Sequence, residues 1–252
     1  MMLVISDLHL GYEKSNKDAF YNFLDDYNTK LDHLIILGDF FDFWRKNNSE
    51  IVLENEKILE KLLDLEAKKI HYIIGNHDYY MLKLKERYGD NFPFEVKRNL
   101  RLEDSGKKFY FTHGYEFEAI QLEPFTIDMY EDFSEKMCFS EDFIGGVAGQ
   151  IWDIIQGSDI KERLEKDPRK RFETSEESLQ IYKMAISTGK CYVFGIEPHE
   201  RLVFGHTHGP FINQSKTVVN SGSWTDELKN KDYQNSYVEI DDGNMDLKFY
   251  RE

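Results

Sequence analysis

Short apolar runs alternate with longer amphipathic stretches through the first third of the chain. Each run is rich in branched residues and ends at a glycine or a polar turn, which predicts buried strands at 2–6 ("MLVIS"), 33–37 ("HLIIL") and 71–75 ("HYIIG"). The segments between them, 16–31 and 49–69, repeat apolar residues at helical spacing, and Ser49 is the predicted N-cap of the second helix. Strand–helix–strand alternation implies right-handed crossovers, so we expect a mostly parallel α/β sheet.

Strand-like runs return in the second half of the chain, after a long interruption. They lie at 107–114, 200–209, 216–224, 235–240 and 244–250. The last two flank "DDG", which predicts a hairpin. Residues 116 to about 199 are instead helical in period and dense in aromatic residues and Met. We therefore expect a single domain over 1–252 that contains a helical cap insertion at about 116–199.

The composition narrows the classes of protein and of partner. With 252 residues, 40% of them hydrophobic, the chain can bury one sizeable core, and its apolar runs have the length of strands rather than of membrane spans. Two cysteines without C-x-x-C spacing, and an N-terminus unlike a signal peptide, favour the cytoplasm. The formal net charge of −15 disfavours nucleic acid as a partner. If the substrate is a phosphate, metal ions are a natural source of positive charge.

Polar side chains follow five of the predicted strands, at the point where each strand ends. Ligands of open α/β sheets bind beyond the carboxyl ends of the strands, so we expect these side chains to share one rim. One such residue alone is most often part of a turn, and one histidine alone is more often structural than a ligand. Together they are hard to explain by packing, because only His33, His71 and His199 of the eight histidines lie outside the set. The set comprises Asp7, His9, Asp39, Asn76, His77, Asp78, His113, His206 and His208.

The donor types in this set indicate a metal centre. Carboxylates, an amide oxygen and imidazoles without a thiolate favour Mn²⁺, with Fe or Zn²⁺ as alternatives. Seven ligands are too many for one ion and suit two divalent metal ions that share one carboxylate. The candidate ligands are Asp7, His9, Asp39, Asn76, His113, His206 and His208.

The same residues carry a resemblance to a known family. The blocks "DLH", "GDFFDFW", "GNHD", "HG" and "GHTH" resemble, in order, the five signature blocks of the calcineurin-like metallophosphoesterases, over roughly 1–114 and 200–252. The resemblance implies a four-layer α/β/β/α sandwich. It also implies that Asp39 bridges two metals and that His77 is not a ligand. Its first metal would be held by Asp7, His9, Asp39 and His208, and its second by Asp39, Asn76, His113 and His206.

Within that superfamily, "GDFFDFW" and the insertion after "THG" resemble the branch that contains the UDP-2,3-diacylglucosamine hydrolases. Two departures count against the substrate of that branch. The branch usually has arginine where this chain has His77, and it has aspartate after the "HG" block where this chain has Tyr115.

The function that the resemblance implies is hydrolysis of a phosphodiester or pyrophosphate bond in a small, lipid- or nucleotide-linked substrate. A metal-bridging hydroxide would attack phosphorus, and His77 would assist the leaving group. Asp78 would orient the His77 ring, although the same carboxylate could instead cap the helix that follows. The alternatives are a nuclease, which the acidic charge disfavours, and a non-catalytic metal-binding scaffold, although such relatives have generally lost metal ligands.

The insertion admits two readings. Its aromatic residues, from Phe117 to Trp152, form either a small core of their own or a lid that holds an apolar group beside the metals. Its basic cluster, 161–172, is either a solvated helix face or a grip on a second phosphate or a membrane headgroup. Peripheral contact with a membrane surface through the cap is thus one expectation. The sequence carries no indication of an oligomeric state.

Overall fold

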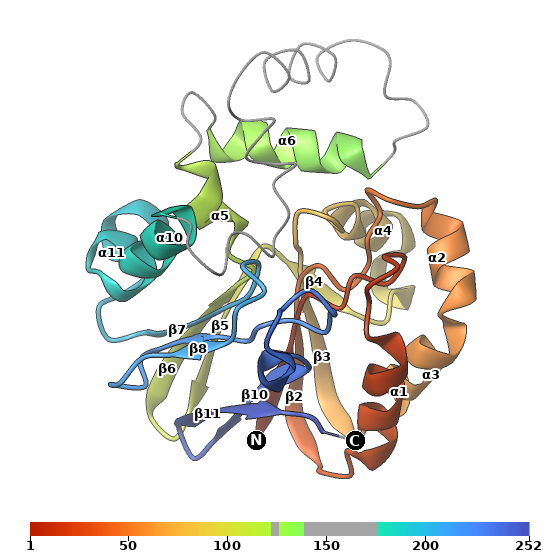
Figure 1. The fold of residues 1–252 in the computed structure, drawn as a ribbon, viewed down its shortest axis with the longest axis horizontal. Coiled ribbons are helices and arrows are strands. Elements are labelled where there is room, and N and C mark those ends of the chain that lie inside the picture. The colour runs from red at the N-terminus through yellow and green to blue at the C-terminus, as the bar shows by residue number, and fades with distance from the viewer. Residues whose placement is uncertain (122–125, 139–175, 252) are drawn as a thin grey trace.

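The computed structural model describes residues 1–121, 126–138 and 176–251, and two β-sheets form its centre (Figure 1). The first sheet has the strand order β11-β10-β1-β2-β3-β4. Strands β1 to β4 run parallel to one another, and β10 and β11 add to the free side of β1 as an antiparallel hairpin. Its strands are β1 (Met2–Ile5), β2 (Leu31–Leu37), β3 (Ala67–Ile73), β4 (Glu95–Lys97), β10 (Ser236–Asp241) and β11 (Asn244–Phe249).

The second sheet has the strand order β5-β6-β7-β9-β8. Its three middle strands, β6, β7 and β9, are parallel, and antiparallel strands close both edges. The strands are β5 (Asn99–Asp104), β6 (Lys107–Thr112), β7 (Arg201–Phe204), β8 (Phe211–Ile212) and β9 (Val218–Asn220). A mostly parallel arrangement with antiparallel edges is common in α/β proteins.

Helices cover the outer faces of both sheets, and α6 lies across one end (Figure 1). Helices α1 to α4 pack against the first sheet, and α5, α10 and α11 pack against the second. They are α1 (Lys17–Asp26), α2 (Asn48–Glu54), α3 (Glu56–Asp64), α4 (Met81–Tyr88), α5 (Tyr115–Ala119), α6 (Ile127–Met137), α10 (Glu176–Ile186) and α11 (Gly189–Phe194). None of the described helices has both the length and the apolar character needed to cross a bilayer.

The alternation of side chains along each strand builds the layers. In β1, Met2 and Val4 belong to the core between the two sheets, whereas Leu3 and Ile5 belong to the core under the helices. Both faces of the strand are therefore buried, which explains why the run reads as continuously apolar rather than alternating. The order helix, sheet, sheet, helix confirms the predicted four-layer α/β/β/α sandwich.

Local details of the first sheet differ from the sequence expectations. Ser49 is not the N-cap of α2, because the side chain of Asn47 takes that place and accepts the Ser49 N–H at 3.0 Å. The predicted helix over 49–69 is two helices, and its last residues belong to β3, which begins at Ala67. Strands β4 and β5 were not predicted. The hairpin at "DDG" is confirmed, with positive φ at Asp242 (47°) and Gly243 (68°), as two-residue turns of this kind require.

The described part of the insertion is helical, as expected. Helices α5, α6, α10 and α11 account for it, and α5 begins directly after the "HG" block. Several residues to which the sequence gave a role lie outside the described residues: Phe125, Phe139, Phe143, Ile151, Trp152 and the basic cluster 161–172. That the insertion and the two sheets form one domain stays a prediction.

His33 in β2 and His71 in β3 form a pair on neighbouring strands, in which His71 is buried and His33 is half-buried. His33 Nδ1 lies 2.9 Å from His71 Nε2, and the two rings are stacked. Burial lowers the pKa of His71 to about 4, and the charge of Glu95 opposes this only in part. The folded state therefore holds His71 neutral where the unfolded chain, with an ordinary pKa near 6.5, takes up a proton.

We expect His71 to make the fold acid-sensitive. Stability is lost as the pH falls from about 6.5 toward about 4, and the shift corresponds to about 2 kcal/mol at pH 5. Urea unfolding at pH 7 and pH 5 measures this, and the drop between the two should be smaller in His71→Gln than in the parent. The exposed His199→Gln serves as the control. An equal drop in His71→Gln and the parent would contradict the assignment.

Candidate metal centre

The predicted site residues gather where the two sheets meet at their carboxyl ends. Asp7 and His9 follow β1, Asp39 follows β2, and Asn76 follows β3, all from the first sheet. His113 follows β6 and the pair His206 and His208 follows β7, from the second sheet. Parallel strands in both sheets thus deliver their ends to one rim, as the pattern of the sequence indicates.

Three overlapping groups of side chains lie close enough to hold metal ions. In each group the donor atoms lie within 4.8 Å of one another. The groups are Asp7, His9 and His208; Asp39, His113 and His206; and His9, Asp39 and His77. Asp39 belongs to two of them, with its Oδ2 3.3 Å from His113 Nε2 and 3.7 Å from His9 Nε2. A carboxylate in this central place is suited to serve two cations at once.

Several donor atoms at the centre are buried and have no hydrogen-bond partner among the described residues. They are Asp7 Oδ1, Asn76 Oδ1 and His113 Nε2. His9 Nε2 and His208 Nε2 face each other at 3.1 Å, and both are close to Asp7 Oδ1, at 3.9 Å and 3.5 Å. Buried polar atoms normally have partners, so such a cluster needs an explanation. Cations bound between these atoms would satisfy all of them, and the donor set therefore fits divalent metals.

Backbone strain is concentrated at the same residues. Five of the candidate ligands have positive φ, in the left-handed region that disfavours side chains: Asp7 (52°), His9 (51°), Asp39 (49°), His206 (66°) and His208 (60°). Each such residue costs about 1–3 kcal/mol, and strain of this kind persists where the surrounding structure over-determines it. The unfavourable backbone conformation of these five residues therefore costs stability and holds their side chains in the candidate site.

Each of the four candidate histidine ligands uses one ring nitrogen to bind the protein. This leaves the other nitrogen for a metal, which fixes the tautomer. The contacts are His9 Nδ1 to Asp42 Oδ2 (3.2 Å), His113 Nδ1 to the Leu37 carbonyl (2.7 Å), His206 Nε2 to Glu118 Oε2 (2.7 Å) and His208 Nδ1 to Glu227 Oε2 (3.0 Å). The sequence interpretation missed Asp42, Glu118 and Glu227. Only Asp42 had a signal, since it lies inside the "GDFFDFW" block.

The predicted partner of the His77 ring is wrong. His77 Nδ1 lies 2.9 Å from Asp42 Oδ1, so Asp42 takes the role that was expected of Asp78. The other oxygen of Asp42 contacts His9 and the Arg45 guanidinium. One buried carboxylate therefore holds both a candidate metal ligand and the candidate acid.

Asp78 instead stabilises the turn that carries "GNHD". Its Oδ1 accepts the Gly75 N–H at 2.7 Å, and its Oδ2 accepts the Phe40 N–H at 2.8 Å and the Tyr72 hydroxyl. Nor does Asp78 cap the following helix, because α4 has no side-chain cap. Asp78 thus ties the end of β3 to the end of β2, where Asp39 Oδ1 accepts the backbone N–H of His77 at 2.8 Å.

The surroundings of His77 favour its charged form. Burial lowers the pKa of His77, but the charges of Asp42 and Asp39 outweigh burial and raise the pKa above its ordinary value. For the Asp42 carboxyl, burial acts in the opposite direction and raises the pKa. The charges and hydrogen bonds of His77 and His9 outweigh burial and hold the pKa of Asp42 well below its usual range. The Trp44 ring stacks on the His77 ring with centroids 4.1 Å apart. The imidazole is therefore fixed from one side by a carboxylate and from one face by an indole.

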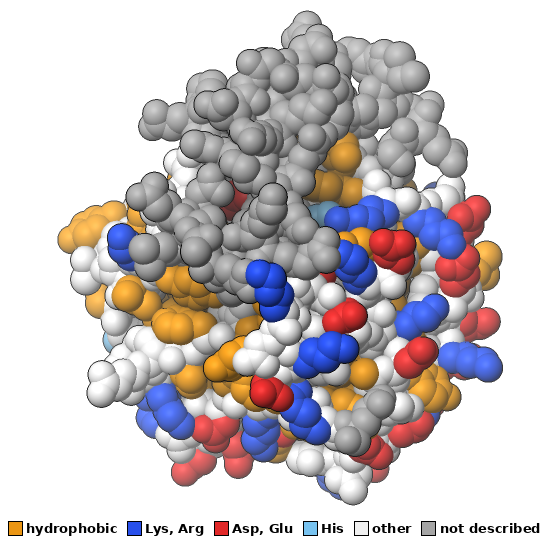
Figure 2. All heavy atoms as spheres, in the orientation of Figure 1, with side chains coloured by type: hydrophobic (Ala, Val, Ile, Leu, Met, Phe, Trp, Pro, Cys, Tyr) orange, Lys and Arg blue, Asp and Glu red, His pale blue; other side chains and the backbone are white. Residues whose placement is uncertain are grey.

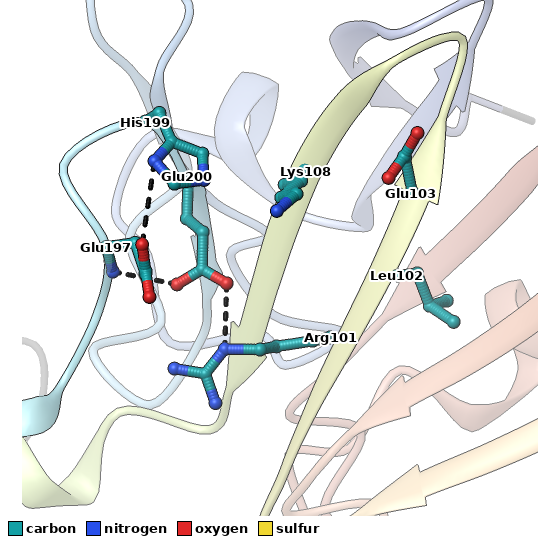
Figure 3. A pocket seen from close by; sticks show the side chains of 7 residues that line it. All are labelled: Arg101, Leu102, Glu103, Lys108, Glu197, His199 and Glu200. Atoms are coloured by element: carbon teal, nitrogen blue, oxygen red, sulfur yellow. Dashed lines mark hydrogen bonds and ion pairs between the residues drawn. The ribbon is translucent and has the colours of Figure 1, made fainter.

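A cavity of about 330 Å³ lies at the other end of the second sheet (Figure 3). It is lined near the beginnings of β6 and β7, by Lys108 and Glu200, whereas the candidate ligands follow the ends of these strands. Glu200 is already paired with Arg101 at 2.7 Å (Figure 3). None of the clustered donor atoms described above contributes to this cavity, so it is no part of the metal centre.

Comparison with protein families agrees with the fold and the site. The family model described as calcineurin-like phosphoesterase matches residues 2–210. The chain belongs to the calcineurin-like phosphoesterase family, which confirms the resemblance found in the sequence. It is a metal-dependent phosphoester hydrolase.

Individual relatives are more distant. The UDP-2,3-diacylglucosamine hydrolase of Aliivibrio fischeri (strain MJ11) is 25% identical over 236 residues, which cover 88% of this chain and 90% of that protein. The enzyme of the same name from Haemophilus influenzae (strain PittGG) is 24% identical over 227 residues, with coverage of 87% and 89%. Among solved structures, a novel archaeal phosphodiesterase has 16% identity, a TM-score of 0.43 and coverage of 98% of each chain.

Proposed function

We propose that this protein uses two divalent metal ions to hydrolyse a phosphodiester or pyrophosphate bond in a small, lipid- or nucleotide-linked molecule. The observation that carries the proposal is the central place of Asp39 between the donors of both sheets. Asp7, His9, Asp39 and His208 would hold the first ion. Asp39, Asn76, His113 and His206 would hold the second. The donor set suits Mn²⁺, Fe or Zn²⁺, and of these we propose Mn²⁺.

When bound, such a metal pair supplies an activated water and neutralises the phosphoryl oxygens. The residues of the chain would do the rest. Asp42 holds Nδ1 of His77, so Nε2 is left to give a proton to the leaving oxygen. Trp44 limits rotation of the ring by stacking on it. The proposed acid is thus oriented before substrate binds, as efficient proton transfer requires.

The position of Arg45 favours a substrate that carries a second anionic group. Its guanidinium binds Asp42 and lies over the Tyr12 ring, 4.1 Å from the centroid, while 41% of the side chain remains exposed. It therefore adds a fixed positive charge on the side of His77, where the leaving group would lie. A pyrophosphate, whose leaving group is itself a phosphate, would use this charge. The relatives named for a UDP-linked sugar also favour a nucleotide-linked substrate.

Two observations bear on the alternatives. On the face in Figure 2, basic and acidic side chains are interspersed among the described residues, and no basic stripe of the kind that tracks nucleic acid is visible. Tyr115, which replaces the aspartate of the resembling branch, is buried and donates its hydroxyl to Glu131 at 2.7 Å. A buried tyrosine in this place supports a substrate different from that of the branch.

The proposal is tested with a Mn²⁺-supplemented substrate screen. The panel holds p-nitrophenyl mono- and diesters, UDP- and CDP-linked lipids, cyclic nucleotides and single-stranded DNA. We expect turnover of diesters and of at least one pyrophosphate-linked compound, and its loss on chelation. Cleavage of DNA at rates above those for every small substrate would favour the nuclease. The cytoplasmic location and a membrane contact through the cap stay predictions.

A further inference from the structure

The insertion reaches into the metal centre through one carboxylate. Glu118, on α5, lies with its Oε2 2.7 Å from His206 Nε2. Both side chains are largely buried, with exposed fractions of 13% for Glu118 and 6% for His206. His206 is one of the group that surrounds Asp39. A contact this short and this buried determines which nitrogen of the ring faces inward.

The two carboxylates described on helix α5, Glu116 and Glu118, contact different parts of the protein. Glu116 turns back to the "HG" block, where it accepts the Thr112 hydroxyl at 2.6 Å and the Gly114 N–H at 3.1 Å. Glu118 instead reaches across to the strand end after β7, where it contacts His206.

Glu118 is also joined to α6. The Tyr130 hydroxyl donates to the same oxygen, Oε2, at 3.2 Å. Helix α6 is in turn fixed to the core through Glu131, which accepts hydrogen bonds from the hydroxyls of Tyr115 and Tyr79 and pairs with Arg98. Two neighbouring residues of α6 therefore make contacts in two directions: Glu131 binds the core, and Tyr130 binds the carboxylate that contacts His206.

We propose that Glu118 is a positioning residue for the second metal ion, so that two helices of the insertion set the affinity of that ion. The inference rests on the proposed function, in which His206 holds the second metal. With Nε2 donated to Glu118, only Nδ1 of His206 is left as a ligand, and the contact fixes the orientation of the ring. Removing an outer-sphere partner of this kind typically weakens metal binding by about 10–100-fold.

The experiment is a titration of the metal-free full-length protein with Mn²⁺, followed by calorimetry, with metal content measured after dialysis. In Glu118→Ala we expect one of the two binding steps to weaken by about 10–100-fold and the other to stay within about 3-fold. Glu118→Gln should lose less metal affinity at that step than Glu118→Ala, since the amide oxygen of Gln can still accept the His206 N–H. Tyr130→Phe should weaken the same step by less than Glu118→Ala does, because Tyr130 acts on His206 only through Glu118. Asp132→Asn, an exposed carboxylate variant on α6, is the matched control.

The outcomes separate the proposal from its rivals. Unchanged binding in Glu118→Ala overturns it, and equal weakening of both steps overturns it too, because Glu118 would then support the centre as a whole. Equal damage by Gln and Ala would make Glu118 a direct ligand, which also contradicts a positioning role. Thermal melting of the isosteric Gln variant verifies its fold. A parent protein that binds fewer than two ions would instead refute the proposed function itself, before any variant is compared.

Discussion

Asp39→Asn is expected to remove both metal ions and, with them, phosphoester hydrolysis. Asp39 is buried, and its Oδ2 lies within 3.3 Å of His113 Nε2 and 3.7 Å of His9 Nε2. A bridging carboxylate contributes the anionic charge that two cations share, so its neutralisation affects both. Because bound metals supply several kcal/mol of transition-state stabilisation, we expect activity to fall by roughly 10³-fold or more. Metal analysis of the purified variant gives the primary measurement.

The comparison variant is His9→Ala, which should chiefly affect one ion. The asparagine substitution keeps the shape of the side chain. Its Oδ1 can still accept the backbone N–H of His77, which Asp39 Oδ1 accepts at 2.8 Å. Loss of metal in Asp39→Asn therefore reflects charge rather than a broken turn. Two full equivalents of metal in this variant would refute the bridging role.

His77→Ala is expected to keep both metals and to lose activity in proportion to how poor the leaving group is. The imidazole is held by Asp42 through Nδ1 and by stacking on Trp44, and general acid catalysis typically contributes about 10²–10⁴-fold. We expect a loss of that size on alkyl diesters. On p-nitrophenyl esters, whose leaving group needs no proton, we expect a loss of less than about 10-fold. Steady-state kinetics on both substrate types, beside metal content, measures the difference.

Each other outcome for His77 assigns a different role. Equal losses on both substrates, with metals intact, would make His77 a stabiliser of phosphoryl charge. Loss of metal would make it a ligand, as its place in a group with His9 and Asp39 allows.

The candidate ligands could be predicted because they follow strands directly. A parallel sheet brings the carboxyl ends of its strands to one edge, so a residue such as Asp7 or His113 is placed by its position in the chain alone. The mostly parallel first sheet could be predicted from apolar runs that alternate with amphipathic helices. The four layers and the pairing of the two sheets came only from the family resemblance.

The groups that orient the histidines could not be predicted in this way. Glu118 and Glu227 reach His206 and His208 from segments 88 and 19 residues away in the chain, and neither lies in a repeating pattern. The choice of Asp42 over Asp78 depends on which carboxylate the turn points inward. The carboxylate of Asp78 accepts hydrogen bonds from the Gly75 and Phe40 N–H groups. This arrangement depends on the three-dimensional fold and could not be predicted from the sequence pattern. Likewise, Asn47 and Ser49 are both good N-caps by residue type, and residue type alone does not choose between them.

The position of β1 between β2 and β10 has a consequence for how the protein is made. One edge of β1 is covered early, by residues 31–37, but the other stays open until residues 236–241 have left the ribosome. An unpaired strand edge invites association with other chains, so nascent protein would be the form most in need of chaperones. Asp7 and His9 must likewise wait for His206 and His208. If these residues hold the metals, as we propose, metal loading would follow synthesis of most of the chain, and cellular metal supply would act on the finished protein.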